Sequence, residues 1–145
     1  MQAQHSKCFD NNIISEFSRA RRLMTSIPGK LPFFLSALLN QKAASMRRRN
    51  HAKQGLDVPP LLIISITRRC MLNCAGCYSK LIHKSDDAEL STERFGEILA
   101  EADDLGISIV MLAGGEPLLR REVLELAGTH QKIIFPIFSN GLALT

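Results

Sequence analysis

The chain has 145 residues, of which 46% are hydrophobic and 22% charged. These proportions are those of a globular domain, and they exclude collagen-like, low-complexity and disordered chains. The longest apolar run, residues 31–39, is far shorter than the roughly 20 residues that a membrane-spanning helix needs. The start of the chain also lacks a basic segment followed by an apolar stretch. We therefore expect no secretory signal, no transmembrane segment and a cytoplasmic location.

The formal net charge of +4 is unevenly distributed along the chain. The first 60 residues carry ten Lys or Arg against three acidic residues, whereas the rest carry eight basic and eleven acidic residues. A net charge of +7 is thus followed by one of −3, and a pair of prolines separates the two parts. This break predicts a basic extension over residues 1–56 and a main domain over residues 57–145.

The basic extension is predicted to be helical. Apolar residues between 13 and 23 indicate one amphipathic helix, which Pro28 and Gly29 end. A second helix is expected from Pro32 to the arginine cluster 47–49. Its apolar side is expected to carry Phe34, Leu35, Leu38, Leu39 and Met46. Two interpretations stay open: a surface for acidic lipid, nucleic acid or an acidic partner, or a helix that packs on the main domain with a solvated basic flank.

Three apolar runs after the extension predict parallel β-strands. They cover residues 61–66, 107–113 and 133–138. Continuous rather than alternating hydrophobicity is typical of strands that are covered on both faces. Pro136 lies inside the third run, which makes that strand less regular.

Two helices are expected between these strands. The first covers residues 91–105, with Ser91 as its N-cap and Gly106 as its end. The second covers residues 120–127 and is closed by Gly128. The alternation of strand and helix predicts an α/β fold with parallel strands and right-handed crossovers.

Each predicted strand runs into a loop with candidate functional residues. The loops carry, in chain order, Cys70, Cys74 and Cys77; Gly114, Gly115 and Glu116; and Ser139 and Asn140. Because the carboxyl ends of parallel strands meet at one edge of a sheet, we expect these loops to lie together.

The cysteine loop is the most informative of the three. Three thiols within eight residues, spaced C-x3-C-x2-C, favour a metal site or catalysis over a disulfide scaffold. They suit a [4Fe–4S] cluster with one iron left open to an outside ligand. Gly76 between the last two cysteines lets the loop fold tightly against the cluster. A zinc site that His83 completes is the alternative, and the distant Cys8 is expected to be a free thiol.

The cysteine spacing and the run from Gly114 to Pro117 together resemble the radical SAM superfamily. The stretch from Gly115 to Arg120 is similar to the branch that contains molybdenum-cofactor, haem-variant and peptide-modifying enzymes. The resemblance covers about residues 57–145. It implies the N-terminal half of a partial (β/α) TIM-like barrel, with its first three β/α units and the basic helical extension before them.

The resemblance also implies cofactors and their ligands. The three clustered cysteines would bind three irons of a [4Fe–4S] cluster, and the fourth iron would bind S-adenosylmethionine (SAM). Cofactor-binding roles fall on Gly114, Gly115, Glu116, Tyr78, Ser139 and Asn140. Tyr78 would lie beside the adenine. The backbone of the Gly-Gly-Glu run would receive the SAM amino group, while the Glu116 side chain would contact the cofactor or hold the loop.

The expected reaction is the one-electron cleavage of SAM to a 5′-deoxyadenosyl radical, which abstracts hydrogen from an unknown substrate. A donor such as flavodoxin or ferredoxin would supply the electron. Two alternatives stay open beside this enzyme. One is a truncated, catalytically inactive fragment that binds the cluster, and the other is a zinc-bearing module that binds RNA or a partner.

Overall fold

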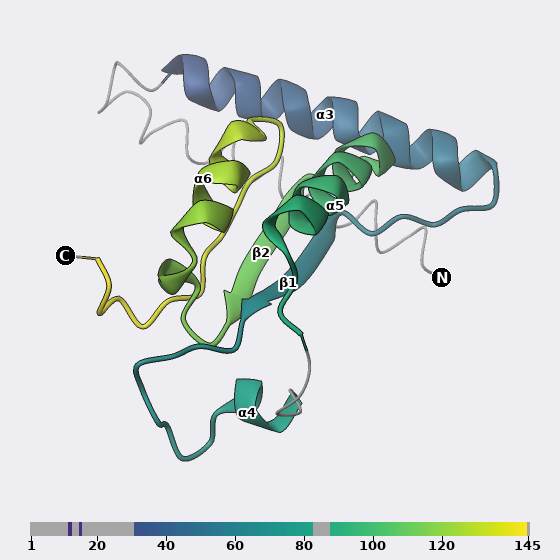
Figure 1. The fold of residues 1–145 in the computed structure, drawn as a ribbon. Helices are drawn as coiled ribbons and strands as arrows, with labels where there is room; N and C mark the ends of the chain where they lie inside the picture. Colours follow the sequence, from purple (N-terminus) through teal and green to yellow (C-terminus); the bar gives the residue numbers. More distant parts are fainter. Residues whose placement is uncertain (1–11, 13–14, 16–30, 83–87, 145) are drawn as a thin grey trace. The chain divides into compact units, whose positions relative to one another are not determined.

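The structure is a computed structural model that describes residues 12, 15, 31–82 and 88–144. Most of the helix predicted between residues 13 and 23 lies outside these residues. The described elements (Figure 1) are α3 (Leu31–Lys53), β1 (Leu61–Thr67), α4 (Tyr78–Ile82), α5 (Thr92–Leu105), β2 (Ile109–Gly114), η2 (Pro117–Leu119) and α6 (Arg121–Thr129). None of the helices in these ranges is long and apolar enough to cross a membrane.

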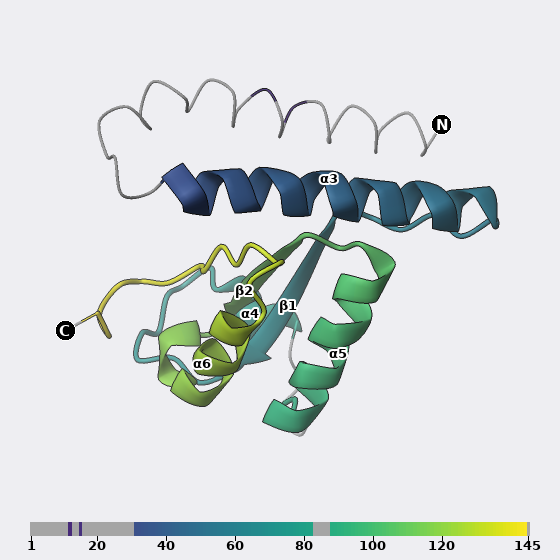
Figure 2. The same ribbon diagram turned by 90° about the horizontal axis from the view of Figure 1, so that it is seen from above.

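The described residues divide into two compact units. One contains the residues up to Pro60 together with Ala102–Ser108, and the other contains Leu61–Glu101 and the residues from Ile109 onward. The first unit is built on α3, which is one continuous helix (Figure 2). It extends beyond the arginine cluster to Lys53, so the predicted end was wrong. Arginine is a good helix former, and the chain instead turns at Gly55, whose φ is 85°.

The buried side of α3 is only partly the predicted one, since Phe34 and Leu38 are half-buried. Leu35, Leu39 and Met46 are exposed by 51%, 66% and 64%. The buried residues are Ala37, Gln41, Ala44, Ser45 and Arg48. The physical reason is close packing within this unit, because a Cβ on Gly106 would lie 2.5 Å from the carbonyl oxygen of Ala44. The small side chain of Ala44 permits that approach, while the longer side chains of Gln41 and Arg48 donate hydrogen bonds to the carbonyl oxygens of Ser108 and Gly106.

Two arginines of the basic cluster have partners inside the same unit. Arg47 forms an ion pair of 2.8 Å with Asp103, and the buried Arg48 donates a hydrogen bond to the carbonyl oxygen of Gly106. The cluster is therefore not the fully solvated flank that one interpretation expected. Arg49 is exposed.

The second unit contains the sheet. β1 and β2 pair in parallel, from Leu61 opposite Ile109 to Ser65 opposite Ala113, and an irregularity then brings Thr67 opposite Gly114. The first two predicted strands and the α/β class are thereby confirmed. Both carboxyl ends point to the end of the sheet where the loop before α4 lies (Figure 1).

The third predicted strand is not a regular strand. Residues 133–138 run parallel to β2 but form only isolated bridges, Ile134 to Ile109 and Ile137 to Leu112. The backbone N–H of Leu112 donates to the carbonyl oxygen of Pro136 at 2.8 Å. Pro136 itself has no N–H to return to a ladder, which accounts for the interruption.

The predicted start of α5 agrees with the structure, whereas the predicted bounds of α6 do not. Ser91 caps α5 as predicted, since its hydroxyl oxygen accepts from the backbone N–H of Arg94 at 3.1 Å. α6 begins one residue later than predicted and ends at Thr129, so Gly128 does not close it. The fully buried apolar side chains of this unit include Phe95, Leu99, Val110, Leu112 and Val123. This core holds the strand ends that carry the candidate site.

Candidate functional site

The loops after β1 and β2 are joined backbone to backbone. The N–H of Gly115 donates to the carbonyl oxygen of Thr67 at 2.7 Å, and the N–H of Glu116 donates to that of Arg69 at 2.8 Å. A Cβ on Gly115 would lie 2.7 Å from the carbonyl oxygen of Arg68 and closer still to that of Arg69. The contact therefore requires glycine at position 115. It places the Gly-Gly-Glu run directly against the residues that precede Cys70.

Tyr78, the first residue of α4, lies against the first glycine of this run. Its hydroxyl group is 3.3 Å from the backbone nitrogen of Gly114 and 3.5 Å from its carbonyl oxygen. Gly114 has a φ of 131°, and a Cβ there would collide with the carbonyl oxygen of Thr67. Tyr78 is 52% exposed. The phenol thus lies beside the loop after β2, while its predicted contact with an adenine stays a prediction.

Glu116 joins the second loop to the third. Its carboxylate is completely buried. One oxygen accepts from the N–H of Leu118 at 3.0 Å, and the other accepts from the N–H of Asn140 at 2.8 Å. The first contact caps η2, and the second joins the loop after β2 to the turn at Asn140.

The hydrogen bonds also decide the charge of Glu116. Burial acts to raise the pKa of its carboxyl group, but the N–H groups of Leu118 and Asn140 and the hydroxyl group of Ser139 lower it by more. The net effect is a pKa below the ordinary value of 4.5. Glu116 is therefore ionised at neutral pH and a poor candidate for a proton donor.

Ser139 and Asn140 form a turn that faces the cysteine loop. The hydroxyl oxygen of Ser139 accepts from the N–H of Gly141, and the side-chain oxygen of Asn140 accepts from that of Leu142, both at 2.9 Å. The side-chain nitrogen of Asn140 is then 3.9 Å from the sulfur of Cys70. The structure therefore brings residues of all three predicted loops together.

The three clustered cysteines are free thiols on the loop between β1 and α4. Cys70 and Cys74 are exposed and Cys77 is half-buried. The backbone N–H of Leu72 donates to the sulfur of Cys70 at 3.4 Å. A Cβ on Gly76 would meet nothing within 4 Å. The predicted role of Gly76 against a cluster therefore stays a prediction.

The three thiols suit a cluster better than a single metal ion. Among the described residues, no three His, Cys, Asp or Glu side chains are grouped so that they could hold one metal ion. A cubane cluster makes a different demand, since each thiolate binds a different iron. Three free thiols on one loop, two of them exposed and one half-buried, fit that demand.

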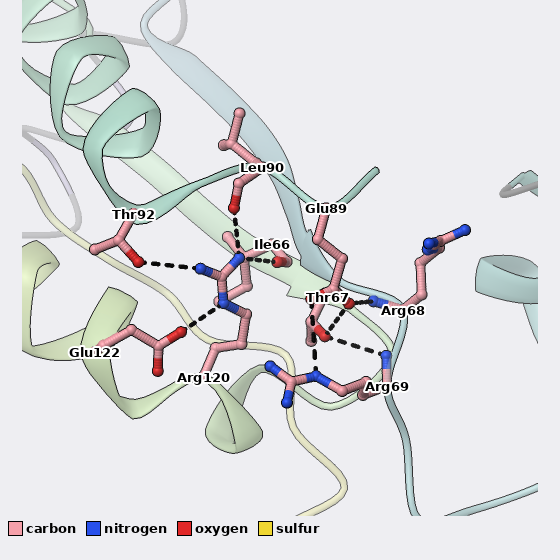
Figure 3. A network of polar contacts seen from close by, with 9 residues as sticks. All are labelled: Ile66, Thr67, Arg68, Arg69, Glu89, Leu90, Thr92, Arg120 and Glu122. Atoms are coloured by element: carbon pink, nitrogen blue, oxygen red, sulfur yellow. Dashed lines mark hydrogen bonds and ion pairs between the residues drawn. The ribbon is translucent and has the colours of Figure 1, made fainter. Parts of the chain in front are cut away.

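Glu89, Thr67 and Arg120 form a polar network that sequence reasoning missed (Figure 3). The Glu89 carboxylate accepts from the Thr67 hydroxyl group at 2.8 Å. The buried Arg120 guanidinium donates to the carbonyl oxygens of Ile66 and Leu90 at 2.9 and 2.6 Å. Arg120 is the last residue of the motif stretch, which was a usable signal. Glu89 lies two residues before the N-cap Ser91, and no sequence pattern there indicated its role in the site.

Comparisons with known proteins match this chain to a family and to curated relatives. The family described as the radical SAM superfamily matches residues 64–144, more than half of the chain. The chain is 31% identical over 96 residues to a PqqA peptide cyclase of Streptomyces rochei. It is 34% identical over 91 residues to a PqqA peptide cyclase of Rhizobium meliloti (strain 1021). No solved structure matches the chain.

The matches cover much of this chain but little of the relatives. They include 65% and 61% of this chain, and 26% and 24% of the two relatives. The chain therefore spans about a quarter of the length of these curated proteins. All three loops of the site lie within or at the edge of the family match.

Proposed function

This chain belongs to the radical SAM superfamily, and we propose that it provides the cluster and SAM site of a radical SAM enzyme. Enzymes of this superfamily use a [4Fe–4S] cluster and SAM. We assign Cys70, Cys74 and Cys77 as the thiolate ligands of the cluster. We assign the backbone at Gly114, Gly115 and Glu116, together with Tyr78, Ser139 and Asn140, to SAM.

The observation that carries this proposal is the pair of hydrogen bonds between the loops after β1 and β2. The N–H groups of Gly115 and Glu116 donate to the carbonyl oxygens of Thr67 and Arg69. One of these acceptors belongs to the residue directly before Cys70. A cofactor that contacts both the thiols and the glycine run would therefore find them side by side.

The chain's own residues have distinct tasks in this proposal. When bound, the cluster supplies the electron that cleaves SAM and so begins hydrogen abstraction from the substrate. Gly114 and Gly115 let the loop after β2 lie against the residues that precede Cys70, since a Cβ on either would collide with backbone carbonyl oxygens there. Glu116 keeps its negative charge and holds the turn at Asn140 beside Cys70. The protein thus binds and orients, and the cofactors carry the radical chemistry.

The wider architecture is part of the same proposal. The parallel pairing of β1, β2 and residues 133–138 supports the first three β/α units of a partial barrel. The basic residues up to position 56 form an extension, for which an acidic partner or a membrane surface remains a hypothesis. Radical SAM enzymes need a reductant and a substrate. We propose a flavodoxin or ferredoxin as the reductant.

We propose a peptide as the substrate class of the whole protein. The support is the name of the two relatives, both PqqA peptide cyclases. Both alignments leave about three quarters of each relative unmatched. The peptide itself is therefore not identified by this chain.

Anaerobic reconstitution tests the proposed site. The 145-residue chain is incubated with iron, sulfide and a thiol reductant, and iron and sulfide are then measured per chain. We expect about four of each and, once the cluster is chemically reduced by one electron, an electron paramagnetic resonance (EPR) signal that changes when SAM is added. After chemical reduction, methionine and 5′-deoxyadenosine report cleavage of SAM.

The other outcomes identify the alternatives. A cluster without cleavage of SAM would support an inactive cluster-binding fragment. Zinc retained through purification, with no uptake of iron, would support the zinc-bearing module and overturn the proposal.

A further inference from the structure

We propose that Glu89 is a positioning residue for the cysteine-bearing loop, because its carboxylate holds the three residues that precede Cys70. This inference rests on the proposed function, since the position of the thiols matters only if they bind a cluster. Glu89 itself contacts no candidate cofactor ligand among its described partners. Glu89 would position the thiols indirectly, through the backbone of the residues that precede Cys70.

One carboxylate engages three consecutive residues (Figure 3). One oxygen of Glu89 accepts from the hydroxyl group of Thr67 at 2.8 Å and from the backbone N–H of Arg68 at 2.9 Å. The other oxygen lies 3.7 Å from the guanidinium nitrogen Nε of Arg69. The Thr67 hydroxyl oxygen in turn accepts from the backbone N–H of Arg69 at 3.1 Å.

Two of these three residues are also held by the loop after β2. The carbonyl oxygens of Thr67 and Arg69 accept from the N–H groups of Gly115 and Glu116. The carbonyls are therefore bound by the loop after β2, while the N–H groups are bound by Glu89 and by Thr67. A backbone that is fixed on both sides has few other conformations available to it. The next residue along the chain is Cys70.

Glu89 is itself held in place through its neighbour. The carbonyl oxygen of Leu90 accepts from the Arg120 guanidinium at 2.6 Å, and the same nitrogen donates to the carbonyl oxygen of Ile66 at 2.9 Å. Arg120 is only 6% exposed. It therefore connects the residue after Glu89 to the residue before Thr67. That connection sets the distance across which the Glu89 carboxylate reaches the loop.

The charge on Glu89 strengthens these contacts. The hydrogen bond from the Arg68 N–H is the largest cause that lowers the pKa of Glu89. The Thr67 hydroxyl group and the charges of Arg69 and Arg120 lower this pKa further, while partial burial acts to raise it. The carboxylate is ionised at neutral pH, so its hydrogen bonds are charge-assisted. Its side chain is 28% exposed, and water weakens the contribution of Arg69 accordingly.

The first test uses the metal-free chain. Glu89→Ala removes the acceptor, Glu89→Gln keeps one acceptor oxygen without the charge, and Glu125→Ala is the control at an exposed carboxylate on α6. Amide hydrogen exchange is measured at Arg68. We expect roughly tenfold faster exchange in Glu89→Ala, as loss of a charge-assisted hydrogen bond predicts. Glu89→Gln should be intermediate, and Glu125→Ala should match the parent chain.

The second test uses the reconstituted chain and separates positioning from stability. The EPR spectrum and midpoint potential of the cluster are compared at equal iron content, together with the urea midpoint of each variant. We expect Glu89→Ala to alter the spectrum and the potential, and Glu89→Gln to restore them at least in part. The urea midpoint of Glu89→Gln should stay near that of the parent chain, so that variant remains informative if Glu89→Ala fails to fold.

Two results would overturn the inference. One is exchange at Arg68 that is unchanged in both Glu89 variants, and the other is a cluster whose spectrum and potential match the parent chain in both. Failure of the parent chain to take up a cluster would contradict the proposed function instead. In that case hydrogen exchange would still decide whether Glu89 holds the loop.

Discussion

The carboxylate of Glu116 accepts a hydrogen bond of 2.8 Å from the backbone N–H of Asn140, which joins the loop after β2 to the turn beside Cys70. The other carboxylate oxygen accepts from the N–H of Leu118 at 3.0 Å. This completely buried side chain thus binds backbone N–H groups from two separate segments of the site.

Replacing Glu116 with Ala should destabilise the fold. Two backbone N–H groups would lose their acceptor, at a cost of about 1–3 kcal/mol each if they stay buried. Urea unfolding followed by circular dichroism measures the change in free energy. Glu125→Ala removes an exposed carboxylate and should shift the midpoint little. Equal stability of the two variants would contradict the structural role of Glu116.

The stability of the chain should fall as the pH is lowered through the acidic range. The pKa values of Glu116 and Glu89 lie below the ordinary 4.5 in the folded state. The unfolded state therefore binds more protons there, so the contribution of both groups is complete above about pH 4.5 and is lost as the pH falls through the folded-state values.

Urea midpoints between pH 7 and about pH 3.5 measure this dependence. In Glu116→Gln, position 116 no longer titrates, so its curve should be flatter than that of the parent chain. Parallel curves would show that Glu116 does not contribute to the acid sensitivity.

Gly115 and Gly128 should respond in opposite directions to replacement by Ala. A Cβ at position 115 would collide with the carbonyl oxygens of Arg68 and Arg69, so Gly115→Ala should destabilise the chain by about 1–3 kcal/mol. Gly128 lies in α6 with nothing within 4 Å of a Cβ. Gly128→Ala should therefore stabilise the chain by about 0.5–1 kcal/mol. Thermal unfolding of both variants under the same conditions is the measurement.

Removal of any one clustered thiol should prevent assembly of the cluster. Cys70→Ala, Cys74→Ala and Cys77→Ala each remove one of three protein ligands, and the cluster depends on all of them. Iron and sulfide analysis after anaerobic reconstitution should show little cluster in each. Cys8→Ala and His83→Ala are the matched controls and should load normally. A full cluster in Cys74→Ala would contradict the ligand assignment.

Local patterns in the sequence predicted most of the secondary structure of the second unit. The apolar runs at 61–66 and 107–113 predicted the strands that the structure has at Leu61–Thr67 and Ile109–Gly114, and Ser91 and Gly106 bound α5. Such features depend on hydrophobic periodicity and on capping, which a single segment displays by itself. The run at 133–138 was less predictable, because Pro136 interrupts its ladder without preventing its parallel position beside β2.

The buried side of α3 shows where local patterns fail. Its large apolar residues Leu35, Leu39 and Met46 are exposed, while Ala44 and Arg48 are buried. The deciding contact is with Gly106, far away in the sequence. Hydrophobicity along one helix does not reveal that a partner backbone will come this close.

The sequence by itself determined the chemistry of this protein: three thiols at C-x3-C-x2-C spacing, a glycine run after the next strand, and the order in which strands and helices follow. These features are contiguous, so composition and spacing display them directly. Only the tertiary structure decided which groups hold them in place, namely Glu89 at the residues before Cys70 and Glu116 at Asn140. The reason is physical: a buried or half-buried carboxylate takes its partners from whichever N–H groups the folded backbone brings within hydrogen-bonding distance, and those groups come from segments far apart in the chain.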